Sequence, residues 1–452
     1  MRVIRADIAW LAESPDDPIR DFGFSKSGEE TFEYWGREHS LRQMVKMVRM
    51  FKPDILIPTF LDVPGQHGHH RALTQTTIAA FDSAADETKF VDLGLAPWQI
   101  NTLYLPAWGG GGGSYDDEVP PPNTTHKIRT GAYDAVLGGT YAQIGEWSRA
   151  CHATQGMGRQ VDEEERPVPL HQLRTARGKA VPTGLTQDVP ERLAALAAHC
   201  WDEKGREAAI LAQKAADDAL AAFPNGEAVL SALCHLQTAL LALEKSVAPR
   251  HVHRVHLKMR QAGMAACEAA ALQFHFDVSP AVPVVGEPAE AILSWHVADP
   301  ANAPVISATM KGPEQITCGP FARSGRGKRR QSMTASLDIA GPPIDAMTGW
   351  HGVMVSPTSL HAEVSVKIAK TKFVVPQCLD TVFSTMPVHT GQLTPNRTLL
   401  RHGKDSDIDM QLQLEATLKP DEHAHLTLPK GWTFDLVAGD SDTKPVSYTH
   451  LR

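Results

Sequence analysis

KPDILIPTFLDVPGQHGHHRA, from Lys52 to Ala72, is the most informative segment of the chain. Its apolar run, Asp54 to Phe60, is bounded by proline and glycine, which is typical of a parallel strand covered on both faces. The segment therefore predicts a buried strand, a polar loop, and a helix from about His70 to Ala85. In open α/β sheets the loops at the carboxyl ends of the strands form the ligand-binding crevice. The three histidines of this loop are expected at such a crevice.

The spacing of these histidines indicates what they could do. His67 and His70 lie three positions apart at the expected start of a helix, so both can point into one crevice. Neutral imidazole is a common zinc ligand, and a second imidazole can donate a hydrogen bond to a developing oxyanion. A solvated loop that happens to be rich in histidine is the alternative, and spacing alone leaves both open.

The same segment resembles the second motif of the PIG-L/LmbE-like zinc-dependent N-deacetylases. In that family a strand reading Arg/Lys-Pro-Asp is followed by His, any residue, Asp, His and then Arg-Ala. Here Lys-Pro-Asp at residues 52–54 precedes His-Gly-His-His-Arg-Ala at residues 67–72. The resemblance implies that His70 is a zinc ligand and that His67 is the catalytic histidine. His69 replaces the aspartate that orients the catalytic histidine in the family.

Two further segments extend the resemblance to roughly residues 21–160. The aromatic-rich segment Asp21–Trp35 is similar to one found in a long-chain branch of the family; aromatic cover for the edge of a core is the alternative. Ala150, His152, Thr154 and Gln155 resemble the family's Ala-His-x-Ser/Thr-Gln motif, with one cysteine inserted. The resemblance implies that His152 and Gln155 contact substrate. The alternative for His152 is a cap at the carboxyl end of a helix over 140–151, where the helix dipole favours positive charge.

The family's first motif, a strand followed by His-Pro-Asp-Asp-Glu, supplies two zinc ligands and the general base. The nearest string here is Ser14-Pro15-Asp16-Asp17, with serine in place of the ligand histidine, and we interpret it as a surface turn. We therefore expect the deacetylase domain to lack its N-terminal strands. A catalytic zinc normally needs three protein ligands, so a chain with one is expected to be inactive as written.

The remainder of the chain divides by pattern. Residues 161–190 are polar and read as a connection. Residues 191–275 have helical periodicity, broken at Asn225-Gly226 and ended at Pro249, and predict a helical hairpin or bundle. From Asp277 apolar and polar residues alternate, which is typical of a β-sandwich. The expected fold is thus an incomplete α/β Rossmann-like domain (1–160), the connection and helices, an Ig-like β-sandwich (276–375), a partial second β-module (376–444) and an artefactual tail (445–452).

Two other patterns in the sequence are candidate binding sites. Gly109–Gly113 is a run of five glycines that lacks the Gly-Lys-Ser/Thr of a phosphate-binding loop, so we interpret it as a mobile loop beside the pocket. His251, His253 and His256 lie among basic residues with no carboxylate or thiolate. They read as a solvated basic helix face and not as a metal site.

Composition limits the classes of function. With 452 residues and a net charge of −8, the chain does not have the basic character of a general nucleic-acid binder. Its six cysteines form no C-x-x-C pair and indicate neither a zinc ribbon nor a disulfide framework. No run of 18 apolar residues and no apolar signal core occur, so no transmembrane segment is expected. Localisation is open, with export suggested only by analogy with other β-sandwich proteins.

The function expected from the resemblance is that of a metal-dependent hydrolase fragment. It would remove the N-acetyl group from an N-acetylglucosamine-type glycan or a related small amide by means of a zinc-activated water. Protonated His67 would stabilise the oxyanion and assist departure of the amine. The alternative, from a different class, is a noncatalytic carbohydrate-binding or cell-surface interaction protein in which the β-modules carry the function.

Overall fold

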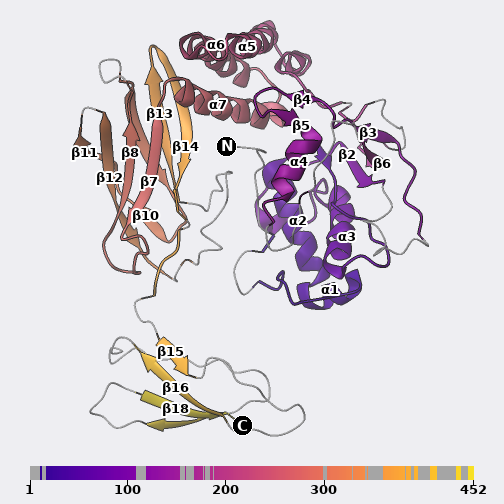
Figure 1. Cartoon of the computed structure of the whole chain (residues 1–452), viewed down its shortest axis with the longest axis vertical. Coiled ribbons are helices and arrows are strands. Elements are labelled where there is room, and N and C mark those ends of the chain that lie inside the picture. The colour runs from indigo at the N-terminus through magenta and orange to yellow at the C-terminus, as the bar shows by residue number, and fades with distance from the viewer. Residues whose placement is uncertain are drawn as a thin grey trace. The chain divides into compact units, whose positions relative to one another are not determined.

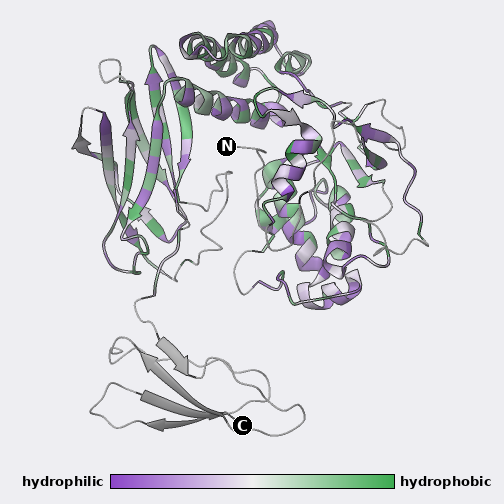
Figure 2. Ribbon diagram, viewed as in Figure 1, coloured by the Kyte–Doolittle hydropathy of each residue, from purple (hydrophilic) through white to green (hydrophobic). Residues whose placement is uncertain are grey.

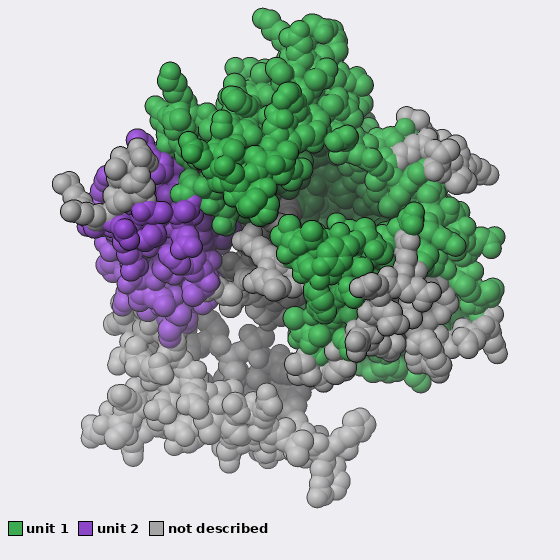
Figure 3. Space-filling view, turned by 45° about the horizontal axis from the view of Figure 1, so that its top comes forward, with its two compact units in different colours: residues 1–270, 351–356, 367–374 green, residues 271–350, 357–366, 375–452 purple. Residues whose placement is uncertain are grey.

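The chain forms two compact units in the computed structural model, coloured separately in Figure 3. Unit 1 comprises residues 1–270, 351–356 and 367–374, and unit 2 comprises residues 271–350, 357–366 and 375–452. The described residues are 11–12, 17–107, 119–152, 158, 167–176, 178, 184–186, 188–298, 303–327, 329–341, 344, 360–381 and 383–387, together with the backbone of strands 391–394, 408–414, 434–438 and 446–451. Unit 1 combines an α/β part with a helical bundle, and unit 2 is rich in β-strands (Figure 1).

The α/β part of unit 1 contains a four-stranded sheet in the order β1-β2-β6-β3. β1 (Ile55–Leu56) is parallel to β2 (Thr102–Pro106), as the apolar segment predicts. β6 (Val168–Thr175) is antiparallel to β2 and to β3 (His126–Ile128). The short hairpin of β4 (Tyr133–Asp134) and β5 (Gly139–Thr140) leads into α4 (Tyr141–Arg149), which Thr140 caps in a capping box.

Three helices precede or follow β1 in the sequence. They are α1 (Gly28–Trp35), α2 (Arg37–Phe51) and α3 (Gly68–Ser83), and α3 packs against both others. The apolar residues Leu41, Met44, Val45, Val48 and Phe51 have the spacing that predicts one buried stripe on α2, and Val45 and Val48 are almost fully buried. They share a core with Phe81 of α3, Ile100 and Leu103. This core holds the C-terminal end of α3 against α2 and β2.

Arg49 of α2 is a charged residue inside this core, with 2% of its surface exposed. Its guanidinium donates hydrogen bonds to five backbone carbonyls at the end of α3 and in the turn that follows, those of Ser83, Ala84, Asp86, Lys89 and Phe90. The last carbonyls of a helix have no partner within the helix and carry its negative dipole end. Arg49 therefore satisfies these acceptors and fixes the turn to α2.

The helical bundle of unit 1 consists of the 3-10 helix η3 (Leu193–His199), α5 (Glu203–Ala222), α6 (Gly226–Glu244) and α7 (Pro249–Ala269). Asn225 caps α6, so the predicted break at Asn225-Gly226 is confirmed. Among the described residues, α6 alone is long and apolar enough to cross a membrane. Its inward residues, such as Leu240 and Leu243, form the bundle core, so this composition is weak evidence for a span.

The bundle core also takes a residue from far along the chain. Phe373 is fully buried among the apolar residues of the bundle. It lies on β14 (Thr371–Cys378), next to the turn that follows β13 (His361–Ile368), within the 367–374 segment of unit 1. The Lys372 carbonyl accepts a hydrogen bond from Gln237 of α6. The core of unit 1 is therefore not made from its N-terminal segment alone.

The described strands of the β-rich part form three sheets. One has the order β10-β12-β8-β7, with β11 also paired to β12, a second has the order β14-β13-β9, and a third has the order β15-β16-β18-β17. Figure 2 shows apolar and polar residues alternating along strands of the first two sheets, as the sequence predicts. The strands not bounded above are β7 (Gln273–Ser279), β8 (Ala289–His296), β9 (Val305–Lys311), β10 (Ile316–Cys318), β11 (Ala322–Arg326), β12 (Arg330–Ile339), β15 (Gly391–Thr394), β16 (Ile408–Leu414), β17 (Phe434–Ala438) and β18 (Val446–Leu451).

Three expectations about local structure are wrong. The strand expected over Asp54–Phe60 pairs only at Ile55–Leu56, because Pro58 has no amide to donate and Ile57 is exposed. The expected connection 161–190 contains β6, which lies inside the sheet between β2 and β3. Pro249 does not end a helix: it is the first residue of α7, where a missing N–H costs no hydrogen bond.

Candidate functional site

The histidine loop is held against the segment before α1 through Gly68, the first residue of α3. The Gly68 amide donates to the Ser25 carbonyl at 2.8 Å. A Cβ at this position would lie 2.3 Å from the Ser27 carbonyl oxygen and 2.4 Å from Ser25 Oγ, so glycine permits an approach that another residue would block. The contact places His67, the N-cap of α3, at the surface, with His69 and His70 in the first turn.

His69 faces the aromatic segment around α1. Its Nδ1 lies 3.3 Å from Ser25 Oγ, which also contacts Thr31 Oγ1 at 2.9 Å. The ring lies 4.5 Å from that of Phe22 and 5.1 Å from that of Trp35, measured between centroids. Its Nε2 is buried and has no hydrogen-bond partner among the described residues. These contacts fix His69 to the Asp21–Trp35 segment, which supports the start of α3.

His67 and His70 lie on the other side of this turn. Their ring centroids are 6.0 Å apart and the rings are nearly parallel, at 15°. His67 is exposed with Phe24 edge-on at 5.2 Å, whereas His70 is partly buried with Phe60 at 4.2 Å. The structure therefore brings the two predicted functional histidines close together.

Burial lowers the pKa of His70, and the nearby His67 and His69 lower it further. Burial also lowers the pKa of His69, with Asp21 acting in the opposite direction and His67 in the same one. Both imidazoles are therefore mostly neutral at pH 7. The neutral form is the one that binds a metal ion.

The described residues do not complete a metal site around these histidines. Within the described ranges, no group of three or more histidine, cysteine, aspartate or glutamate side chains is arranged to hold a metal ion. The nearby carboxylate of Asp62 is occupied by Arg71 at 2.6 Å and by Gln75 at 2.9 Å. Two imidazoles are fewer than the three protein ligands of a catalytic zinc site.

The other predicted site residues lie apart from this loop in the sequence. His152 is exposed just after α4, with its Nδ1 3.0 Å from the Arg149 carbonyl oxygen, which is the geometry of the capping alternative. Gln155 and the glycine run Gly109–Gly113 lie outside the described residues. So do Ser14 to Asp16 of the expected surface turn. Asp17 is described and corrects that expectation, because its carboxylate is buried and contacts His39 at 3.0 Å.

The second histidine cluster is not the solvated helix face that the sequence predicts. His251 of α7 is buried against His199, with ring centroids 4.1 Å apart, and its Nδ1 accepts a hydrogen bond from Arg254. His253 packs edge-on against Trp98 at 5.0 Å. A carboxylate is also present, since Asp54 of the α/β part forms a two-pronged ion pair with Arg254. Of the three histidines only His256 is exposed, and it contacts Glu244 at 2.6 Å.

Buried His251 and partly buried His253 predict loss of stability in acid. Burial, followed by the neighbouring basic groups, lowers the pKa of His251 and of His253 from 6.5 to about 4. Below pH 6.5 these histidines bind protons in the unfolded chain but stay neutral in the folded chain. The free energy of unfolding therefore decreases as the pH falls from 6.5 to about 4. We expect this loss to be roughly 2 kcal/mol after allowance for solvent screening.

The measurement is urea unfolding at pH 7.5 and pH 4.5, compared with the His251→Gln/His253→Gln variant. The wild-type chain should lose more stability between these two pH values than the variant does. Protonation of carboxylates affects both proteins and cancels in the comparison. An equal loss in both proteins would contradict the prediction.

Comparison with known proteins adds no family assignment. No family model matches the chain, and no curated protein matches it. Among solved structures, one similar chain is the Pseudomonas fluorescens alkylpurine DNA glycosylase AlkC bound to DNA containing an abasic site analog, at 14% identity and a TM-score of 0.15. The match spans 42% of this chain and 65% of the glycosylase chain. A TM-score this low carries no argument about fold or function. The chain is thus defined as a protein with an α/β and helical unit and a β-rich unit.

Proposed function

We propose that unit 1 carries the histidine loop of a hydrolase resembling the PIG-L/LmbE-like N-deacetylases. The substrate would be an N-acetyl amide of the N-acetylglucosamine type or a related one. The observation that supports this most is the pairing of exposed His67 with partly buried, neutral His70 at the start of α3, after a strand of a parallel pair. The proposal includes a Rossmann-like arrangement for the α/β part and an Ig-like one for the β-rich part.

Each histidine has a role that its environment favours. His67 is solvent-accessible at the N-terminal end of a 16-residue helix, where backbone N–H groups favour negative charge. It would donate a hydrogen bond or a proton to the oxygen of an amide under attack. His70, kept neutral by burial, would serve as a metal ligand. His69, bound to Ser25, would hold the turn that positions both.

We further propose that the chain as given hydrolyses amides slowly or not at all. A zinc ion bound at His70 would supply the polarisation of the carbonyl and the activation of water, but the described residues do not fit a complete zinc site. Activity would then require ligands from outside the described residues. The roles proposed here are those of His67, His69 and His70.

The test is the zinc content of the purified chain by elemental analysis, together with acetate release from N-acetylglucosamine. We expect well below one zinc per chain, and no acetate release above background, for both the wild type and His70→Ala. His235→Ala is the matched control, because His235 is an exposed histidine on α6. About one zinc per chain that is lost in His70→Ala but kept in His235→Ala would support the ligand role and overturn the proposal of inactivity.

The shortage of metal ligands favours a second candidate function, noncatalytic binding of carbohydrate by the β-rich unit. Among the described residues, that unit holds most of the strands. Binding of glycans by a chain without zinc and without hydrolysis, unaffected by His67→Ala, would support this candidate over the hydrolase.

A further inference from the structure

A cavity of about 230 Å³ lies inside unit 1, where the α/β part meets the helical bundle. Its wall is formed by three segments that are far apart in the sequence, namely the turn from α2 to β1, the start of η3, and α7. The lining residues are Phe51, Lys52, Pro53, Asp54, Pro190, Glu191, Arg192, Leu193, Leu196, His253, Arg254, Leu257 and Lys258. The cavity does not include any residue of the histidine loop at the start of α3.

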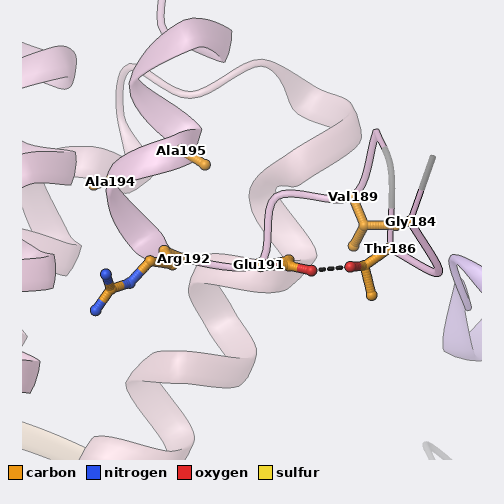
Figure 4. A pocket seen from close by; sticks show the side chains of 7 residues that line it. All are labelled: Gly184, Thr186, Val189, Glu191, Arg192, Ala194 and Ala195. Carbon is orange, nitrogen blue, oxygen red and sulfur yellow. Dashed lines mark hydrogen bonds between the residues drawn. The ribbon is translucent and has the colours of Figure 1, made fainter. Parts of the chain in front are cut away.

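The charged groups of this wall are mainly positive. Four cations line it, Lys52, Arg192, Arg254 and Lys258, against the two carboxylates of Asp54 and Glu191. Each carboxylate already has a partner. Asp54 is held by Arg254 in a two-pronged ion pair at 2.5 Å. Glu191 accepts a hydrogen bond from Thr186, as Figure 4 shows for the adjoining hollow of about 520 Å³.

The remaining cations have weak partners or none. Arg192 points away from Thr186 in Figure 4 and reaches Asp217 only at 3.5 Å. Lys258 donates to the neutral amide of Gln261 at 2.9 Å. Within the described part of the chain, no carboxylate pairs with Lys52, which is held in the left-handed conformation (φ 52°) as the C-cap of α2. A positive charge with no counterion next to a cavity is a binding determinant for an anion.

His253 also lines this cavity. Its Nδ1 is buried, and the backbone of Arg250 lies within hydrogen-bonding reach of the ring. Burial and the nearby charges of Arg254 and Lys52 keep the ring neutral, so His253 adds no charge to the wall.

We propose that this cavity binds a small anion, a carboxylate or a phosphate, that carries an apolar group. Lys52 and Lys258 contribute the charge. Phe51, Leu193, Leu196 and Leu257 form an apolar wall that suits the rest of the ligand. Arg254 is held rigidly by Asp54 and adds positive potential at fixed geometry. This site is independent of the hydrolase proposed above, since it shares no residue with the histidine loop.

The experiment is isothermal titration calorimetry of the full chain with two probes, inorganic phosphate and hexanoate, at low salt. We expect at least one probe to bind, and Lys52→Gln to weaken that binding about tenfold, which corresponds to about 1.4 kcal/mol. Lys204→Gln is the matched control, because Lys204 is an exposed lysine on α5 that does not line the cavity. Binding in this control should equal that of the wild type.

A second variant and a folding measurement test whether weaker binding results from unfolding of the protein. Lys258→Gln should also weaken binding, and thermal unfolding by circular dichroism should show that both lysine variants remain folded. Binding of phosphate alone would identify a phosphate site, and binding of hexanoate alone a carboxylate site; each supports the proposal. Absence of binding for both probes at about 10 mM, or equal affinity in Lys52→Gln and Lys204→Gln, would overturn it.

Discussion

Replacing Asp54 by alanine is expected to lower the free energy of unfolding by about 3–5 kcal/mol. The substitution leaves the guanidinium of Arg254, whose side chain is only 17% exposed, without the two oxygens of its carboxylate partner. It also removes an acceptor from the Asn101 side chain, 3.2 Å from Asp54. Because Asp54 lies just before β1 and Arg254 lies on α7, the loss should loosen the bundle from the α/β part. Urea unfolding followed by circular dichroism measures the effect.

Two control variants compare the stability contribution of this partly buried ion pair with that of an exposed one. Asp218→Ala removes the exposed partner of Lys214 on α5 and should cost less than about 1 kcal/mol. The double variant Asp54→Ala/Arg254→Met should recover part of the stability lost in Asp54→Ala, because no buried charge then lacks a partner. A cost for Asp54→Ala no greater than that for Asp218→Ala would show that the buried pair contributes little.

Arg49→Ala is expected to destabilise the chain by a similar amount, about 3–5 kcal/mol. The substitution removes the donor for five backbone carbonyls in a region that water does not reach freely. It also leaves a cavity beside Val45 and Val48. The midpoint of urea unfolding should fall with little change in slope.

Arg42→Ala serves as the comparison on the same helix. Arg42 forms an exposed ion pair with Asp92, so its loss should change stability little. If Arg49→Ala unfolded at the same urea concentration as Arg42→Ala, water or neighbouring groups would have to satisfy the five carbonyls instead.

The sequence predicts helices better than it predicts what their polar residues do. The stripe of α2 and the helix break at Asn225-Gly226 are local patterns, and both are confirmed. Arg49 reads as part of the polar face of α2, because nothing within its own helix reveals the carbonyls at the end of α3. The strand β6 was missed for a related reason: it contains Pro169 and few apolar residues, and β2 and β3 supply its pairing from elsewhere in the chain.

The two histidine clusters also show that local sequence patterns do not reveal contacts with distant segments. The proximity of His67 and His70 follows from their spacing at a helix start. The burial of His251 and His253 does not, because the groups that cover them include His199 and Trp98, which lie 52 and 155 positions earlier in the sequence. The glycine of His-Gly-His-His is a feature of the sequence from which part of this structure can be predicted. A small residue between histidines indicates a close backbone approach, which the structure places at Ser25 and Ser27.

The position of Phe373 in the bundle core has a consequence for biosynthesis. When α7 has been translated, the ribosome must still add about 100 residues before Phe373 is made. At roughly 5–20 residues per second that takes about 5–20 s. During this interval the nascent helices have an unfilled apolar site where Phe373 will pack. The core of the bundle is therefore complete only after the β13–β14 hairpin has been synthesised.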